Sequence, residues 1–265
     1  VTDRDRRFDD LYNLVCDPAF LRVAWERVAG NKGARTPGVD RATVAAITSG
    51  IGIEAFLHHV RDQLRSRTFQ PVPVRQVMIP KASGKLRKLG IPTVTDRVVQ
   101  AALKLVLEPI FEADLQPEQY AYRAERGAQD AVQAVHRLLN TGHQQVIDAD
   151  LSGYFDSIPH PELMKSVARR IVDRHVLHLI KQWLDAPVEE DDGHGHRKRT
   201  TSNRDTGRGT PQGAPISPLL SNLYMRRFIL GWKTLGYARR WSAQIVNYAD
   251  DFVICCKGRA EDAMD

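Results

Sequence analysis

Two acidic residues stand side by side where two apolar runs meet near the end of the sequence. In "QIVNYADDFVICCK", Asp250 and Asp251 separate a run that contains Ile245 and Val246 from the run at residues 252–256. Each run is short and rich in β-branched or aromatic residues, which predicts a hairpin of two buried strands with the acids at its tip. Ala-Asp-Asp is also acceptable turn chemistry. Adjacent carboxylates repel each other, so their placement between strands needs a reason from the rest of the chain.

A third carboxylate ends another predicted strand. The sequence predicts a buried strand over residues 145–151, in which Asp148 and Asp150 share a face and Asp150 precedes a Ser-Gly break. An Asp at a strand end is often only a cap or a turn residue. If this strand lies beside the hairpin that carries Asp250, the carboxylates converge and need divalent cations, and hard oxygen ligands favour Mg²⁺ or Mn²⁺. Two ions about 4 Å apart can activate a hydroxyl and stabilise a leaving group.

The basic charge is concentrated in one segment. Residues 61–104 hold ten basic and two acidic side chains, a net charge of +8, whereas the whole chain carries +6, so the remainder carries −2. Concentrated basic charge is typical of proteins that bind a polyanion such as nucleic acid or nucleotide phosphate. A merely solvated basic face is the alternative.

The composition is that of an ordinary globular protein. The chain has 265 residues, 42% of them hydrophobic and 26% charged. No run approaches the roughly 18 apolar residues that a membrane span needs, and the charged N-terminus has no apolar signal-peptide core. Three cysteines are too few for a disulfide framework and favour a reducing compartment, which makes the cytosol the expected location. The sequence does not begin with Met, which suggests a fragment.

The pattern of apolar residues predicts a mixture of helices and strands. A basic hairpin is expected on both sides of residues 82–84, and the tract at 189–209, which has no apolar residue, is expected to lie in solvent or on a polar partner. Because helices and strands are interspersed without regular βαβ alternation, we expect an α+β fold. Apolar spacings of three and four predict helices within 8–30 (two, broken near Pro18), 52–66, 98–111, 128–139, 161–172, 174–185 and 215–233.

Six blocks of the sequence, in order, resemble those of bacterial group II intron-type (retron-type) reverse transcriptases and maturases. The resemblance extends from about residue 24 to residue 257. The blocks are "NKGARTPGVD", "IPKASGKLRKLGIPTVTDRVVQ", "QYAYRAERGAQDAV", "DADLSGYFDSI", "GTPQGAPISPLLSNLYM" and "YADDFVI".

The resemblance implies a right-hand polymerase with an antiparallel palm sheet flanked by helices and with its thumb missing. We expect an N-terminal helical extension and loop at 1–40, fingers at 41–143, and a palm at 144–265 that carries a polar insertion at 186–209 and is truncated before the thumb. A piece without a thumb is expected to be weak or inactive alone. A dimer, or a second polypeptide that supplies the thumb, would complete it.

The resemblance also assigns roles to single residues. Asp150, Asp250 and Asp251 match the catalytic carboxylates, and Leu151 would add its carbonyl to a site for two Mg²⁺ ions, with Mn²⁺ as a substitute. Asp148 is not required by the family pattern, Asp156 after the gate is expected to be structural, and a metal site at His194 and His196 is not expected. The remaining assignments are dNTP binding by Lys81, Arg87, Gln212 and Gly213, a steric gate under the sugar at Phe155, a primer contact at Tyr248, and template contact or a stabilising role for Arg123 and Arg126.

The function expected from the resemblance is RNA-directed DNA polymerase activity in the bacterial cytosol or nucleoid. Its partners would be an RNA template, a DNA primer, dNTPs and intron RNA, with no membrane. One alternative is a non-catalytic maturase that binds intron RNA and assists splicing, although intact carboxylates favour catalysis. Another is a domesticated reverse transcriptase in phage defence or CRISPR adaptation.

Overall fold

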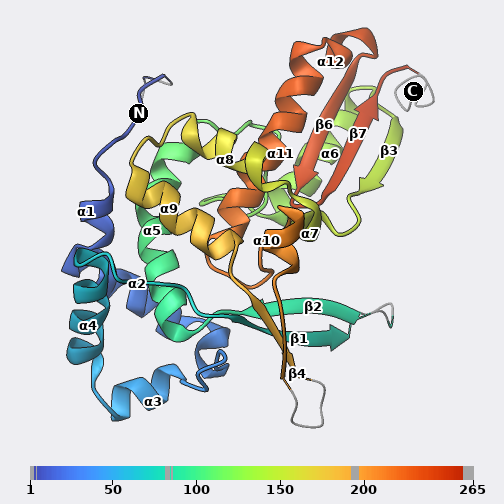
Figure 1. Ribbon diagram of the computed structural model, residues 1–265. Helices are drawn as coiled ribbons and strands as arrows, with labels where there is room; N and C mark the ends of the chain where they lie inside the picture. The colour runs from blue at the N-terminus through green and yellow to red at the C-terminus, as the bar shows by residue number, and fades with distance from the viewer. Residues whose placement is uncertain (1–2, 4, 81–83, 85, 192–196, 259–265) are drawn as a thin grey trace. The chain divides into compact units, whose positions relative to one another are not determined.

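The computed structural model (Figure 1) describes residues 3, 5–80, 84, 86–191 and 197–258. The chain divides into two compact units. The first contains Val1–Ile110 and Phe155–Ser217, and the second contains Phe111–Tyr154 and Pro218–Asp265. This division follows packing, whereas the expected fingers and palm follow sequence motifs, so those boundaries stay a prediction.

Helices form most of the first unit. The predicted break near Pro18 is confirmed, because α1 (Tyr12–Val15) ends before α2 (Pro18–Gly30) begins. Asp17 accepts a hydrogen bond from the backbone N–H of Ala19 at 2.8 Å, and proline suits the first helical position because it has no N–H to satisfy. The other helices of this unit are η1 (Lys32–Arg35), α3 (Val44–Ser49), α4 (Ile53–Arg65), most of α5 (Val94–Glu112), most of α7 (Tyr154–Ser157), α8 (His160–Ala168), α9 (Arg174–Leu184) and α10 (Ser202–Thr206).

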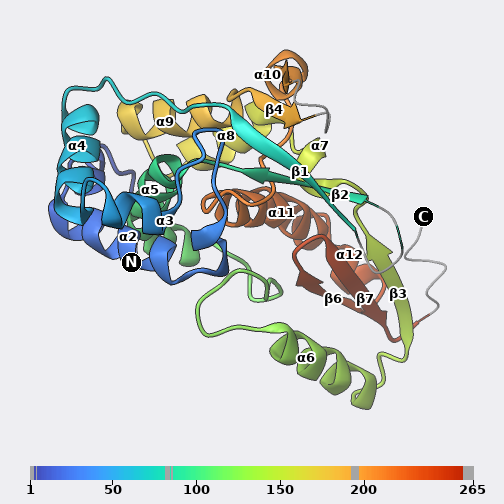
Figure 2. The ribbon, with the colours of Figure 1, turned by 90° about the horizontal axis from the view of Figure 1, so that it is seen from below.

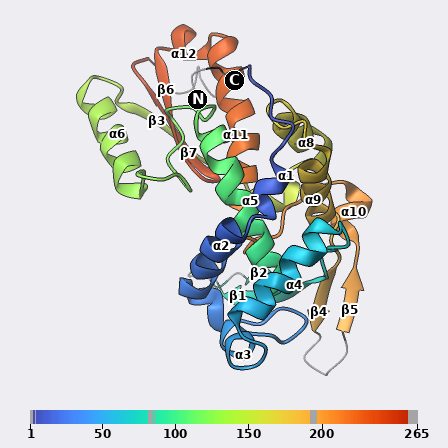
Figure 3. The same cartoon turned by 90° about the vertical axis from the view of Figure 1, so that its left-hand side faces the viewer.

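The first unit also holds a four-stranded sheet in the order β2-β1-β4-β5. The predicted basic hairpin is confirmed as β1 (Val74–Pro80) paired antiparallel with β2 (Leu86–Ile91). The polar tract adds a second hairpin, β4 (Val188–Asp191) and β5 (Arg197–Thr200), which Figure 3 shows together. Because β1 and β4 run parallel, this sheet is mixed.

Two arginines of the basic segment hold the loop at residues 31–40 in place. The guanidinium of Arg97, a residue only 7% exposed, donates to the carbonyls of Gly33 (2.7 Å) and Thr36 (2.9 Å). Arg75 donates to the carbonyl of Pro37 at 2.9 Å. Part of the positive charge predicted to attract a polyanion therefore serves the fold itself.

The second unit is an antiparallel sheet with a helix against each face, which agrees with the predicted α+β class. The strands β3 (Gln145–Asp150), β7 (Asp251–Cys256) and β6 (Ala243–Tyr248) lie side by side in that order. The helix α6 (Ala128–Asn140) packs against Val246, whereas Trp232 of α11 (Ser217–Thr234), beside α12 (Tyr237–Arg240), packs against Ile245 (Figure 2). Since Ile245 and Val246 are consecutive in a strand, they point to opposite faces.

The predicted burial of the strand at 145–151 is wrong. β3 is an edge strand whose side chains alternate between exposed and half-buried, and Val146 is 42% exposed. The cause is that α6 covers β6 and β7, so the outer strand keeps its polar residues in solvent. In the described part of the chain, no helix is both long and apolar enough to cross a membrane.

Candidate active site

The predicted convergence of carboxylates occurs at one end of the three-stranded sheet. The register of β3 on β7 places Asp150 directly opposite Asp251, and β6 brings Tyr248 to the other side of Asp251. The backbone N–H of Leu151 donates to the carbonyl of Asp250 at 3.1 Å, so β3 stays in contact with the hairpin beyond its last residue. The structure thus brings Asp150, Leu151, Tyr248, Asp250 and Asp251 together.

A buried asparagine shapes the acidic turn. The side-chain amide of Asn247, a residue 1% exposed, donates to the carbonyls of Ala249 (2.9 Å) and Asp251 (3.1 Å). These bonds hold Ala249 in the left-handed region, at a φ of 59°, where residues other than glycine are uncommon. Sequence reasoning missed Asn247. The signal was a polar residue inside an apolar strand, since a buried amide must find hydrogen-bond partners.

The carboxylates disturb one another electrostatically. Burial raises the pKa of Asp251, and the neighbouring charges of Asp250, Asp150 and Asp148 raise it further. Crowded carboxylates repel each other, and their hard oxygen donors suit a divalent cation. In the part of the chain that the structure describes, no group of three His, Cys, Asp or Glu side chains is arranged to hold a metal ion. The carboxylate and carbonyl oxygens present are donors of the kind that Mg²⁺ takes, in ones and twos, with water or phosphate oxygens completing its shell.

In the first unit, the structure joins two of the predicted nucleotide-binding segments. The Nε of Arg87 donates to the side-chain oxygen of Gln212 at 2.8 Å, and the backbone N–H of Gly90 donates to the Gln212 carbonyl at 2.7 Å. Gly213 has a φ of +113°, and a Cβ there would lie 2.6 Å from the carbonyl oxygen of Gly90. The Pro-Gln-Gly loop can therefore lie along the edge of β2 only because residue 213 has no side chain.

The structure tests neither the predicted steric gate nor one of the predicted phosphate ligands. Phe155 is only 6% exposed, belongs to the first unit, and accepts a hydrogen bond from the Thr210 N–H at its carbonyl, at 2.8 Å. Lys81 lies outside the described residues. Both assignments stay predictions.

Arg123 and Arg126 are engaged within the second unit. The Arg123 guanidinium bonds the Glu112 carboxylate and donates to the carbonyls of Gln116 and Gln119, each at 2.8 Å. Arg126 donates to the Pro117 carbonyl at 2.7 Å and lies over the Tyr120 ring. These bonds are those of the stabilising alternative, and a template contact by either residue stays a prediction.

Comparisons with known proteins agree with this geometry. The family model for reverse transcriptase (RNA-dependent DNA polymerase) matches residues 79–264. Protein YkfC of Escherichia coli is 36% identical, over 97% of this chain and 73% of its own length. The group II intron-encoded protein LtrA of Lactococcus lactis is 32% identical over 86% of this chain, which covers 36% of LtrA.

Solved structures show the same fold. A chain of the Cas6-RT-Cas1–Cas2 complex matches with a TM-score of 0.55 and 22% identity, covering 95% of this chain and 39% of that one. Its likeness supports the fold and nothing finer. By the family model and by its similarity to YkfC, the chain belongs to the reverse transcriptase family, and its relatives include group II intron-encoded proteins.

Proposed function

We propose that this chain carries the nucleotidyl-transfer site of an RNA-directed DNA polymerase, which extends a DNA primer on an RNA template with dNTPs. The observation that supports it most is the register of β3 on β7, which sets Asp150 opposite Asp251, with the Asp250 carbonyl bonded to the N–H of Leu151. These carboxylates repel one another unless bound cations offset their charge.

In this proposal, Asp150, Asp250, Asp251 and the Leu151 carbonyl hold two Mg²⁺ ions. When bound, these ions supply charge neutralisation at the attacking and leaving oxygens. The primer 3′-oxygen attacks the α-phosphorus and loses its proton to solvent, while the bond to the β-phosphate breaks and pyrophosphate leaves. Arg87 binds phosphate oxygens through a guanidinium that Gln212 already orients.

The proposal assigns roles to three further residues. Gly213 lets the Pro-Gln-Gly loop approach the nucleotide, and Phe155 favours dNTPs by excluding a ribose 2′-hydroxyl. Tyr248, which lies across from Asp251 and is 38% exposed, supports the primer end.

The decisive experiment is single-nucleotide extension of a DNA primer on an RNA template, at protein in excess over primer. Asp150→Ala and Asp250→Ala are each expected to lower incorporation by at least about 10³-fold, since each removes a cation ligand. The matched control is Asp148→Ala, which removes an exposed carboxylate from the same face of β3 and is expected to keep activity within a few fold. Equal losses in all three variants, or none, would rule out the metal assignment.

The relatives also support a role in intron RNA binding. Among them are intron-encoded proteins and a nuclear intron maturase of Arabidopsis thaliana, which is 30% identical over 41% of this chain. A maturase role would coexist with polymerisation or replace it, and a partner polypeptide or second copy would complete the chain. Tight intron RNA binding without any dNTP incorporation by the wild-type chain would favour the maturase alternative.

A further inference from the structure

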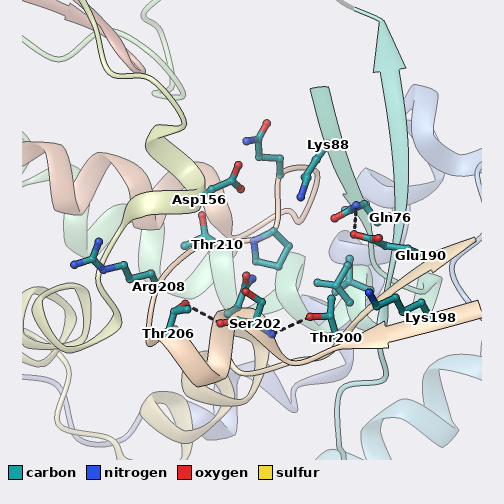
Figure 4. Close-up of a pocket in the computed structure, with 16 residues that line it drawn as sticks. Gln76, Lys88, Asp156, Glu190, Lys198, Thr200, Ser202, Thr206, Arg208 and Thr210 are labelled. Atoms are coloured by element: carbon teal, nitrogen blue, oxygen red, sulfur yellow. Dashed lines mark hydrogen bonds between the residues drawn. The ribbon is translucent and has the colours of Figure 1, made fainter. Parts of the chain in front are cut away.

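A polar cavity of about 520 Å³ lies against one face of the four-stranded sheet. The wall on the sheet side carries Gln76, Lys88, Glu190 and Lys198, and the opposite wall is the segment from Thr200 to Gln212 with α10 (Figure 4). Its volume falls in the range of ligand pockets, roughly 300–1,000 Å³. All of its lining residues belong to the first unit.

The cavity lies on the face of the sheet opposite to Arg87. Side chains alternate along β2, so Lys88 and Gly90 line the cavity whereas Arg87 points to the other face. The register confirms this, because Gly90 is opposite Gln76 and Lys198 is opposite Glu190, and directly opposed residues share a face. Gln212 borders both faces since its loop lies along the edge of β2. The proposed polymerase chemistry leaves this cavity unused.

The β4–β5 hairpin neutralises its charge on one face only. Glu189, on the face away from the cavity, forms ion pairs with Arg197 (3.1 Å) and Arg199 (3.3 Å). On the cavity face, the Glu190 carboxylate instead accepts a hydrogen bond from the Gln76 amide at 2.5 Å. Lys198 consequently has no ion-pair partner among the described residues, and the same holds for Lys88 and Arg208.

The cavity also offers acceptors that are not used within the described chain. Thr210 is 1% exposed, and its hydroxyl oxygen has no hydrogen-bond partner there. Figure 4 shows Thr210 and the Asp156 carboxylate on the same wall of the cavity. Cations suit phosphate oxygens, whereas a carboxylate suits a hydroxyl that donates. RNA presents both groups in each nucleotide, and DNA lacks the 2′-hydroxyl.

We propose that this cavity binds one nucleotide of single-stranded RNA. Lys88 and Lys198 contact its phosphate, Arg208 on the far side of Asp156 and Thr210 contacts the phosphate of the neighbouring nucleotide (Figure 4), and Asp156 and Thr210 bond the ribose 2′-hydroxyl. The proposal rests on the proposed function only in taking RNA as the ligand class. It gives the polar β4–β5 segment a role in holding RNA, separate from nucleotidyl transfer.

The test measures fluorescence anisotropy of a labelled, unstructured RNA oligonucleotide in EDTA and without dNTPs, so that failure of polymerisation does not affect the result. The double variant Lys198→Gln/Arg208→Gln is expected to weaken binding about tenfold and to lower the salt slope by about 1.4, at roughly 0.7 per lost contact on a single strand. The matched control, Arg197→Gln/Arg199→Gln, removes the same charge from the opposite face and is expected to change affinity by less than about threefold. Equal losses in the two double variants would overturn the proposal.

Two further arms identify the ligand. Wild-type protein is expected to bind RNA more tightly than DNA of the same sequence, and Asp156→Ala is expected to reduce that ratio. Equal affinity for RNA and DNA in the wild type would overturn the assignment to RNA. A DNA primer paired to RNA, with or without an unpaired RNA overhang, separates the sources. If Lys198→Gln/Arg208→Gln loses affinity only for the duplex that has the overhang, the bound strand is the template. If it also loses affinity for free RNA, the cavity binds any RNA strand.

Discussion

Gly213 shows how a single residue fixes the Pro-Gln-Gly loop against β2. Replacing it with alanine would place a Cβ 2.6 Å from the Gly90 carbonyl oxygen, at a φ of +113° that L side chains rarely adopt. We expect Gly213→Ala to lower the free energy of unfolding by about 1–3 kcal/mol, measured by urea denaturation. Gly231→Ala in α11 is the control, because a Cβ there meets no atom within 4 Å and alanine favours a helix by up to about 1 kcal/mol. A Gly213→Ala protein as stable as the wild type would contradict this reading.

At the same scale, candidate reactive residues are easier to predict from the sequence than the partners that they contact. Asp150 and Asp250 could be predicted because each ends an apolar run. The bond between Arg87 and Gln212 could not, because 125 positions separate them and only tertiary packing joins them. The Asn247 amide bonds residues only two and four positions away, but the pairing of its backbone with residues 118 and 120 again joins distant segments.

The start of α5 makes one element sensitive to pH. Asp96 accepts hydrogen bonds from the Thr93 hydroxyl at 2.8 Å and from the Trp183 indole at 3.3 Å. Burial nevertheless raises the pKa of Asp96 to about 6, against 3.8 for an unperturbed group. The stability contributed by this group is therefore fully present below about pH 4 and is lost as the pH rises through about 6.

The corresponding prediction compares wild type with Asp96→Asn by urea denaturation at pH 5 and pH 7.5. Between these values the wild type should lose about 1 kcal/mol more than the variant, because the amide cannot ionise. Comparing the two proteins cancels the titration of the nine histidines. An identical pH dependence in both would show that Asp96 is ionised throughout the range.

Elements defined by local pattern were predictable, and those defined by distant pairing were not. Alternation of apolar and polar residues gave the β1–β2 hairpin, and helical spacing gave α4, whose bounds differ from the expected range by one residue at each end. The burial of β3 was predicted wrongly because a strand's burial depends on which helix covers it, which its own sequence does not encode. The parallel pairing of β1 with β4 likewise joins segments more than a hundred residues apart.

The positive charge of the described residues divides into cations that are bonded within the fold and cations that are not. Arg97 and Arg75 bond loop carbonyls, and Arg123 is paired with Glu112. Lys88, Lys198 and Arg208 have no such partner among the described residues and are free to contact phosphate. The net charge of +6 counts both kinds of cation. The affinity proposed for RNA should depend on the unpaired set.

The last prediction follows from that division and concerns the protein as a whole. Raising monovalent salt from about 50 to 200 mM should weaken RNA binding about tenfold or more, as release of counterions from three or more phosphates requires. In EDTA, Asp150→Ala should bind RNA at least as tightly as the wild type, because it removes a negative charge while it abolishes incorporation. Anisotropy titrations over the salt series measure both, and unfolding midpoints at each salt concentration control for loss of the fold. A flat salt response would mean that the basic residues are only solvated surface, and parallel loss of binding and incorporation in Asp150→Ala would mean that the carboxylates support the fold.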